Sequence, residues 1–325
     1  MLLVRPFQQL EPKKMPKSGY IAIIGRPNAG KSTLLNAVLQ TEISIVTPKA
    51  QTTRDRILGI LTEKPGQIVF IDTPGIHKAL QGGINEYMVN QAKEALDAPN
   101  LIWYLVDPYS GIEHENTVLD LLEKAPRSPL FLIMNKIDAL SKRVTQTEVD
   151  ALESKITQSM KDRGISYKKT FLLSALKNQG VNPLLEESWN FIPEGVPFYP
   201  DPEQVSDRPT RFFVAEKIRE RLYYLLGEEL PYSCAVEIEA FKENTKPVRI
   251  EANIYVERES QKGMVIGSQG KKIKEIGQAA RAEIEKFLGE QIFLGLKVKV
   301  LPHWTDNAEG LRKIGYSVPQ KKKRR

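Results

Sequence analysis

Residues 25–32 combine glycines, a lysine and a serine at a spacing that suits phosphate binding. The stretch reads Gly-Arg-Pro-Asn-Ala-Gly-Lys-Ser and fits G-x-x-x-x-G-K-[ST], between an apolar run at Tyr20–Ile24 and an amphipathic stretch at Lys31–Gln40. Glycines let backbone N–H groups turn inward around a phosphate, and a helix N-terminus adds a favourable field. We expect Lys31 to reach the β- and γ-phosphates and Ser32 to ligate Mg²⁺. The pattern predicts a nucleoside triphosphate site.

A second group of residues follows the apolar run that ends at Ile71. Asp72-Thr73-Pro74-Gly75 stands there, where the Asp72 carboxylate can hold a magnesium-bound water and the Gly75 N–H can reach a γ-phosphate. The next residue is Ile76, at the position where Ras-like enzymes carry the glutamine that orients the attacking water. An aliphatic side chain cannot orient water. We therefore expect slow intrinsic hydrolysis that an added group or ion accelerates.

Two further motifs are suited to selecting the base. Asn135-Lys136-Ile137-Asp138 follows a predicted strand, and its last carboxylate can accept two hydrogen bonds from guanine N1–H and N2–H₂, a pair that adenine lacks. Ser174-Ala175-Leu176 ends the next strand, where a backbone N–H can reach guanine O6. Ligands bind outside the carboxyl ends of strands in open α/β sheets, so the motifs predict one guanine-nucleotide site. Its expected residues are Gly25, Arg26, Pro27, Asn28, Ala29, Gly30, Lys31, Ser32, Thr33, Asp72, Thr73, Pro74, Gly75, Asn135, Lys136, Asp138, Ser174, Ala175 and Leu176.

These motifs require a mostly parallel sheet to position them. From Tyr20 to about Ile192 short apolar runs alternate with amphipathic stretches, which predicts right-handed βαβ units and an α/β P-loop fold. Arg56–Thr62, a turn at Pro65-Gly66 and the next run predict a hairpin that adds one antiparallel strand. The other expected strands are Tyr20–Ile24, Gln67–Ile71, Leu101–Val106, Leu130–Met134 and Lys169–Leu173, and the expected helices are Lys31–Gln40, Ile84–Asp97, Glu115–Lys124, Thr147–Arg163 and Val181–Phe191.

A cluster of prolines divides the chain. Pro193, Pro197, Pro200, Pro202 and Pro209 exclude a continuing helix or central strand, because proline lacks an N–H donor and fixes φ. Beyond it, the patterns predict an α+β module made of a helix at Arg211–Leu226, strands at Ser233–Lys242 and Val248–Glu257, a helix at Gly270–Leu288 and a strand at Phe293–Leu301. We expect an N-terminal extension at 1–17, a nucleotide-binding domain at 18–193, a linker at 194–209, a second domain at 210–305 and a C-terminal segment with a basic tail at 306–325.

The second domain carries a loop suited to a nucleic-acid backbone. Val265–Lys274 contains an apolar segment, a G-x-x-G turn and a lysine-rich helix start, and KH domains clamp about four nucleotides of RNA with such a loop. Residues after 204 carry 24 basic and 17 acidic side chains, which accounts for the whole net charge of +7, although five of the basic ones form the tail Lys321–Arg325. The expected RNA-binding residues are Ile266, Gly267, Ser268, Gln269, Gly270, Lys271, Lys272 and Lys274.

Taken together, the motifs GRPNAGKS, DTPG, NKID and SAL resemble those of translation-factor-type bacterial GTPases. Gln51–Asp55 (QTTRD) resembles the effector loop of the Era group and its relatives. The order helix, strand, strand, G-x-x-G, helix, strand is similar to that of a type II KH domain, and Arg211–Leu222 and Glu229–Ser233 are similar to the beginning of the Era KH domain. Over roughly Gly19–Trp304 the chain resembles the Era family of KH-domain-containing ribosome-assembly GTPases.

This resemblance implies an activity and its catalytic residues. It implies hydrolysis of GTP to GDP and phosphate, with Lys31, Thr53, Gly75 and Asn28 as catalytic residues. It also implies Mg²⁺ on Ser32, Thr53 and Asp72, with Thr52 competing for the place of Thr53. Related GTPases with an Asn at this place and an apolar residue after DTPG are activated by K⁺, which makes K⁺ a second candidate ion. Arg54 is the rival source of charge, unless its neighbour Asp55 pairs with it.

The resemblance also implies partners: a single-stranded segment of small-subunit ribosomal RNA, and the small ribosomal subunit whose assembly the protein would assist. Two alternatives are a tRNA-modification GTPase and an RNA-binding module with a vestigial nucleotide site. The first ends in a cysteine and lacks a KH domain, whereas this chain ends at Arg325. The second is disfavoured because the residues expected to hold phosphate and metal are all present.

The amino-acid composition limits which structural classes the protein can belong to and indicates its cellular compartment. The 325 residues are 41% hydrophobic and 27% charged, an ordinary globular balance. The single cysteine, Cys234, excludes an intrachain disulfide and a cysteine zinc cage and is typical of a reducing compartment. No apolar run reaches 18 residues, and Met1–Lys17 lacks the apolar core of a signal peptide. We expect a cytoplasmic monomer, and the resemblance adds peripheral contact with the inner face of the membrane.

Overall fold

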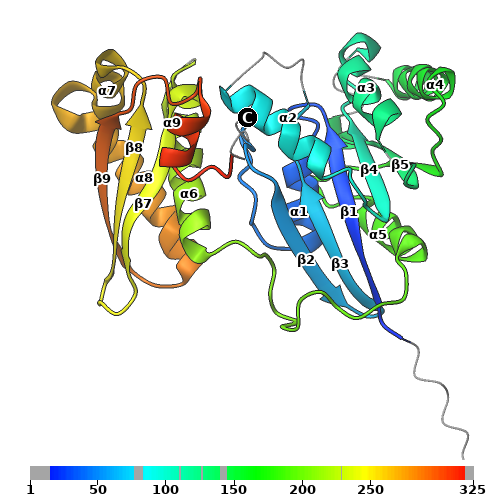
Figure 1. Ribbon diagram of the computed structural model, residues 1–325, viewed down its shortest axis with the longest axis horizontal. Helices are drawn as coiled ribbons and strands as arrows, with labels where there is room; N and C mark the ends of the chain where they lie inside the picture. The colour runs from blue at the N-terminus through cyan, green and yellow to red at the C-terminus, as the bar shows by residue number, and fades with distance from the viewer. Residues whose placement is uncertain are drawn as a thin grey trace, which may run out of the picture.

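The computed structural model describes residues 15–76, 83–109, 111–125, 127–139, 145–227 and 229–318. It contains a six-stranded and a three-stranded sheet, which lie side by side with the C-terminal segment between them (Figure 1). The strands are β1 (Lys17–Gly25), β2 (Ile57–Glu63), β3 (Gly66–Asp72), β4 (Leu101–Val106), β5 (Leu130–Met134), β6 (Lys169–Leu172), β7 (Ala235–Lys242), β8 (Val248–Val256) and β9 (Ile292–Val300). The helices are α1 (Lys31–Leu39), α2 (Gly83–Glu94), α3 (Asn116–Lys124), α4 (Gln146–Asp162), α5 (Val181–Ser188), α6 (Thr210–Leu225), α7 (Glu259–Ile266), α8 (Lys271–Leu288) and α9 (Ala308–Lys313).

Short 3₁₀ helices complete the described chain. They are η1 (Ile112–His114), η2 (Ile137–Ala139), η3 (Trp189–Phe191), η4 (Leu230–Ser233) and η5 (Ser268–Gly270). The predicted helix at Val181–Phe191 is therefore an α-helix that tightens into 3₁₀ geometry after Ser188. None of the helices in the described ranges is long and apolar enough to cross a membrane.

The larger sheet has the predicted mixed topology. Its order is β2-β3-β1-β4-β5-β6, and every neighbouring pair is parallel except β2 with β3. β4 and β5 are buried along their whole length, as continuous apolar runs in a parallel sheet require. The α/β prediction with one antiparallel strand is confirmed. Because β1, β3, β5 and β6 run in the same direction, the motifs that follow them meet at one edge.

Helices cover both faces of this sheet and form two cores. On one face α1 and α5 pack over alternate side chains of β1, β3 and β4, with Phe70 and Trp103 at the centre. On the other face α2, α3 and α4 pack over the intervening side chains. This layering holds the strand ends rigidly, which is what a binding site at their edge needs.

The proline-rich stretch runs along the outer edge of the sheet. The Ile60 N–H donates to the Val205 carbonyl at 2.9 Å, and the Ser206 hydroxyl donates to the Leu58 carbonyl at 2.6 Å. β2 is an edge strand, and such contacts satisfy backbone groups that would otherwise be open to pairing with another chain. The stretch is thus packed against the domain that precedes it.

The C-terminal module is an α+β domain in which α6 and α8 pack on one face of the β7-β8-β9 sheet. β8 pairs antiparallel with β7 and parallel with β9. Two helices extend beyond the sequence prediction. α7 precedes the G-x-x-G turn, where the sequence predicts only an apolar segment. Its eight residues include Gly263, and only Val265 among them is buried. α9 lies in the C-terminal segment.

The C-terminal segment packs against both modules. Trp304, Leu311 and Ile314 form a small core with Tyr87 of α2 and Ala235 of β7. The predicted basic tail lies outside the described residues, as do positions 1–14 of the predicted extension.

Candidate functional site

The loop between β1 and α1 has the geometry of a phosphate cradle. Asn28 and Gly30 have φ values of 62° and 96°, in the left-handed region. A Cβ at Gly30 would stand 2.2 Å from the Asn135 amide nitrogen, so glycine is required there. Lys31 is 6% exposed, and its ammonium donates to the carbonyls of Gly25 and Arg26 at 3.1 and 2.8 Å. Burial lowers the pKa of Lys31 to about 8, so a bound phosphate would strongly favour the charged form.

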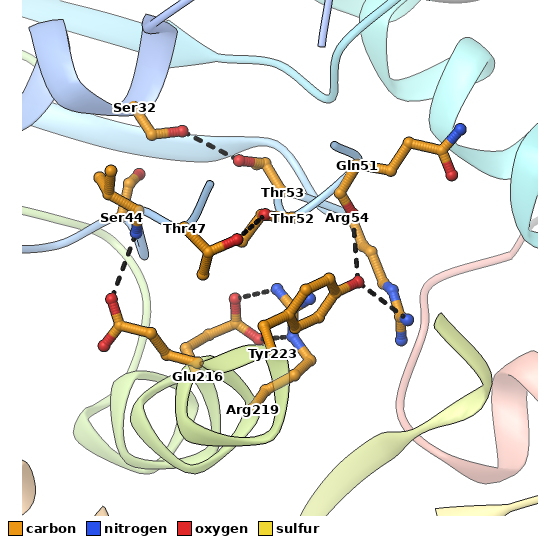
Figure 2. Close-up of polar contacts among 12 residues, drawn as sticks. Ser32, Ser44, Thr47, Gln51, Thr52, Thr53, Arg54, Glu216, Arg219 and Tyr223 are labelled. Carbon is orange, nitrogen blue, oxygen red and sulfur yellow. Dashed lines mark hydrogen bonds and ion pairs between the residues drawn. The ribbon is translucent and has the colours of Figure 1, made fainter. Parts of the chain in front are cut away.

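Three oxygen side chains converge beside Lys31. The Ser32 hydroxyl donates to Asp72 Oδ2 at 2.7 Å. It also lies 2.9 Å from the Thr53 hydroxyl (Figure 2). Asp72 is fully buried, and its Oδ1 has no hydrogen-bond partner among the residues that the structure describes. Burial raises the pKa of this carboxyl, opposed by the charge of Lys31. Hard oxygens and an unsatisfied carboxylate fit Mg²⁺, which neutralises charge on the β- and γ-phosphate oxygens when bound.

The geometry separates the two candidate threonines. Thr53 faces Ser32, whereas the Thr52 hydroxyl lies 2.6 Å from that of Thr47 and donates to the Lys49 carbonyl at 2.8 Å (Figure 2). Thr52 therefore stabilises the fold of the effector loop. Of the two, only Thr53 is placed to join the metal ligands.

The base motifs are joined to the phosphate loop by Asn135, which is 2% exposed. Its amide donates to the Ala29 carbonyl at 2.8 Å and accepts from the Ala175 N–H at 3.0 Å. The Asp138 carboxylate accepts a hydrogen bond from the Ser174 hydroxyl. The four sequence motifs thus form one connected site. Asn135 therefore holds the phosphate loop and the Ser174–Leu176 loop in a fixed position relative to each other.

Gly75 and Ile76, at the end of the DTPG motif, have different structural roles. A Cβ at Gly75 would stand 2.5 Å from the backbone of Pro27, which requires glycine. The Ile76 N–H donates to the Gly25 carbonyl at 3.1 Å, and its side chain is 3% exposed, within the core beneath α2. Ile76 is therefore packed inward as well as apolar. It cannot orient a water at the γ-phosphate.

The G-x-x-G loop joins α7 to α8 and is open to solvent. Gly267, Gln269 and Gly270 have φ values of 72°, 51° and 73°, and Ser268 and Gln269 are exposed. A Cβ at Gly267 would stand 2.6 Å from Lys272 Cβ, which explains the glycine. The tight turn presents backbone at the start of a lysine-rich helix, the arrangement that KH domains use for RNA.

Arg54 is buried in the C-terminal module, and nothing in the sequence predicts this placement. It is 4% exposed, and its guanidinium donates to the carbonyls of Cys234 and Tyr232, each at 2.8 Å. The ring of Trp304 lies 5.5 Å from it, and the Tyr223 and Tyr316 hydroxyls lie at 3.4 Å. We call these five residues the Arg54 cage. The rival hypothesis that Arg54 supplies charge at the phosphates does not fit this placement.

Asp55 contacts α2, and the part of the chain that the structure describes holds no ion pair between Asp55 and Arg54. Its carboxylate accepts a hydrogen bond from Tyr87 of α2, and burial raises its pKa. This contact joins the effector loop to the helix that follows the DTPG motif. At the start of α2, the Ile84 N–H donates to the Thr305 carbonyl at 2.8 Å. Both segments that flank the γ-phosphate side therefore contact the C-terminal module.

Helix α6 and Leu226, directly after it, make further contacts with the segment 40–56 between α1 and β2, which contains Gln51–Asp55 and is called the effector loop as a whole. Lys217 is 2.9 Å from Glu42, the Lys49 ammonium donates to the Leu226 carbonyl at 2.7 Å, and the Tyr223 hydroxyl donates to the Gln51 carbonyl at 3.4 Å (Figure 2 shows the last). Charged and main-chain groups make up much of this interface. Apolar contacts add to them, because Phe213 of α6 is buried in the core of the larger sheet and Tyr87 of α2 is buried beside Trp304.

Comparison with known proteins identifies the family. The chain is 44% identical over 304 residues to GTPase Era of Carboxydothermus hydrogenoformans, and the match covers 93% of this chain and 98% of that protein. The chain belongs to the Era family of GTPases. GTPase Era of Staphylococcus haemolyticus is 41% identical over 310 residues. Family models described as a 50S ribosome-binding GTPase and a KH domain match residues 20–136 and 229–305.

Solved Era structures have the same fold as this Era-family chain. One is described as Era in complex with MgGDPNP and nucleotides 1506–1542 of 16S ribosomal RNA. It is 35% identical, has a TM-score of 0.86, and is matched over 93% of this chain and 100% of that chain. A variant of Aquifex aeolicus Era bound to GDP·AlF₄⁻ is 36% identical, with a TM-score of 0.84 and the same coverage. The predicted fold and GTP hydrolysis are confirmed, with GTP, GDP and Mg²⁺ as cofactors.

Proposed function

We propose that this Era-family GTPase binds a single-stranded segment of small-subunit ribosomal RNA through its G-x-x-G loop and assists small-subunit assembly. The observation that carries the proposal is the exposed loop between α7 and α8, with lysines at the start of α8 and a left-handed backbone that nucleic acid can approach. The likeness to an Era structure that contains a 16S fragment supports it. Crosslinking to cellular RNA and mapping the crosslinks tests it, and sites outside small-subunit RNA would overturn it.

Within this function we assign roles to the nucleotide-site residues. Lys31 binds the β- and γ-phosphates, and Ser32 and Asp72 hold Mg²⁺ or its water. Thr53 joins them when a γ-phosphate is present, and the Gly75 N–H binds that phosphate. Asp138 and the backbone of the Ser174–Leu176 loop read the base. The short Ser32–Thr53 and Ser32–Asp72 distances support this assignment.

We further propose that the Arg54 cage couples the nucleotide to RNA binding. Thr53 and Arg54 are consecutive, so their Cα atoms are about 3.8 Å apart. A backbone movement that brings Thr53 to the metal therefore also moves Arg54 within its cage. We expect RNA affinity to differ at least about fivefold between the GDP form and the form with a non-hydrolysable GTP analogue. In Arg54→Ala the two dissociation constants should converge to within about twofold. Fluorescence anisotropy at one stated salt concentration measures both.

The matched control is Arg249→Ala. Arg249 lies over the ring of Phe293 on the small sheet, and its charge is the same as that of Arg54. This variant should keep the parental difference between the two nucleotide states, even if its overall RNA affinity falls. Equal affinities in the two states of the parent protein would contradict the coupling. The RNA-binding proposal would then still stand by itself.

K⁺ is a proposed activator that would act at Asn28. Within the described residues the Asn28 side chain makes one hydrogen bond, from Nδ2 to the Pro48 carbonyl at 3.2 Å, which leaves its amide oxygen to accept a cation. Positive charge beside the β–γ bridge stabilises the charge that grows as the bond breaks. We expect GTP hydrolysis to be roughly tenfold faster in K⁺ than in Na⁺ at equal ionic strength. This acceleration is smaller than the ~10³–10⁵-fold increase in kcat that an arginine finger gives.

The variant that tests Asn28 is Asn28→Gly, because glycine tolerates the left-handed backbone that alanine does not. Phosphate release at saturating GTP should lose its preference for K⁺ in this variant. Identical rates in the two salts for the parent would remove Asn28 from the mechanism and favour a group supplied by RNA.

The domain limits and location remain part of this proposal. We propose 18–193, 194–209 and 210–305 as the GTPase domain, linker and KH domain, since α6 begins at Thr210. β1 begins at Lys17, so the last residue of the expected extension belongs to the first strand. We also propose a cytoplasmic location, with salt-reversible contact between the basic tail and anionic lipid. Recovery in the membrane fraction after a high-salt wash would contradict such contact.

A further inference from the structure

The nucleotide site has a wall that comes from the KH domain. A cavity of about 460 Å³ lies over the phosphate loop, lined by Lys31 and Ser32 at one part and by Asp138 and Leu176 at another. The effector loop contributes a third side. Tyr224, near the end of α6, also lines this cavity. A side chain about 190 positions away from the phosphate loop therefore belongs to the GTP site.

Three exposed apolar side chains meet around this cavity. Val46 is 37% exposed, Leu176 is 71% exposed and Tyr224 is 50% exposed. They come from the effector loop, the loop after β6 and the KH domain. Exposed apolar side chains that gather around a cavity mark a surface that a ligand covers. The ribose and the purine of a nucleotide have apolar faces that can cover these side chains, whereas its phosphates require the part of the cavity lined by Lys31 and Ser32.

The ring of Tyr224 is held in position. Its hydroxyl donates to the Val46 carbonyl at 3.0 Å, and the Arg221 guanidinium lies 4.8 Å from its centroid. Arg221 is itself paired with Glu220 at 2.9 Å. The neighbouring Glu220 carboxylate accepts a hydrogen bond from the Val46 N–H at 3.3 Å. α6 thus places an aromatic side chain against the effector loop with little freedom to turn away.

We propose that Tyr224 contacts the ribose and base side of the bound guanine nucleotide, so that the KH domain directly slows nucleotide release. Aromatic side chains gain affinity by packing on nucleobases, and they do so with two rotatable bonds to order. Nucleotide leaves only when Tyr224 is displaced, either alone or with α6. Binding of RNA that shifts α6 would then change the affinity for nucleotide. Thermodynamic linkage requires that nucleotide change the affinity for RNA by the same factor.

The test uses the full-length protein loaded with tritiated GDP and chased with unlabelled GDP. Tyr224→Ala should release GDP about tenfold faster, because the loss of one base-stacking aromatic costs about that factor. Tyr224→Phe should stay within about twofold of the parent, since the ring is retained.

The control variant is Tyr167→Ala, which removes a tyrosine of similar exposure (40%) on the far loop that follows α4. It should release GDP at the parental rate. Parental release from Tyr224→Ala would overturn the inference. It would also be overturned if Tyr224→Phe released GDP as fast as Tyr224→Ala, because the hydrogen bond to Val46 would then carry the whole effect.

Discussion

Asp138→Asn is expected to lose affinity for GTP by about 100-fold or more and to gain affinity for XTP. The Asp138 carboxylate offers two acceptors to guanine N1–H and N2–H₂, and hydrogen bonds to a charged group contribute about 1.5–3 kcal/mol each. An amide presents one acceptor and one donor. Xanthine carries a carbonyl where guanine carries N2–H₂, so the amide matches xanthine and opposes guanine.

Competition between labelled GDP and unlabelled GTP or XTP measures this exchange. Hydrolysis of saturating XTP by Asp138→Asn should approach the parental rate with GTP, because Lys31, Ser32 and Asp72 are untouched. Parental affinity for GTP in the variant would remove Asp138 from base recognition. Cys234 reports folding, since burial raises the pKa of its thiol to about 12 and a folded variant should resist thiol reagents.

The second large effect is expected at the KH loop. Replacing Ser268 and Gln269 by aspartate places two negative charges on the exposed turn where RNA phosphate must approach. Like charges in contact cost several kcal/mol, so affinity for single-stranded RNA should fall by roughly 100-fold. GTP binding should not change, because the turn does not line the nucleotide cavity.

Two controls separate local charge from net charge. Ser154→Asp with Gln158→Asp on α4 makes the same change in net charge on exposed positions of the other domain. It should weaken RNA binding only slightly and mainly at low salt. Ser268→Ala with Gln269→Ala should bind within about threefold of the parent, because the glycines and lysines remain. RNA binding by the double aspartate variant at parental strength would exclude this loop as the RNA site.

Parts of the fold and site could be read from the sequence because their causes are local. β4 and β5 begin and end at the predicted residues, since an apolar run of five or six between polar turns can only be a buried strand here. The strand ends then brought the four motifs to one edge of the sheet, because parallel strands align their carboxyl ends. The motifs likewise placed Gly30 and Gly75 in the site, where a Cβ would meet the Asn135 side chain and the Pro27 backbone respectively.

The tertiary structure decided what depends on distant partners. Thr52 and Thr53 are equal in sequence, and only the folded loop shows that Thr53 faces Ser32 while Thr52 faces Thr47. Arg54 donates hydrogen bonds to main-chain carbonyls. Because every residue has a carbonyl, the residue types in the sequence do not indicate which of them Arg54 binds. Tyr224 reads as an ordinary helix residue until α6 is placed beside the nucleotide cavity. Contacts between groups some 180 residues apart are set by how two domains pack, which local periodicity does not encode.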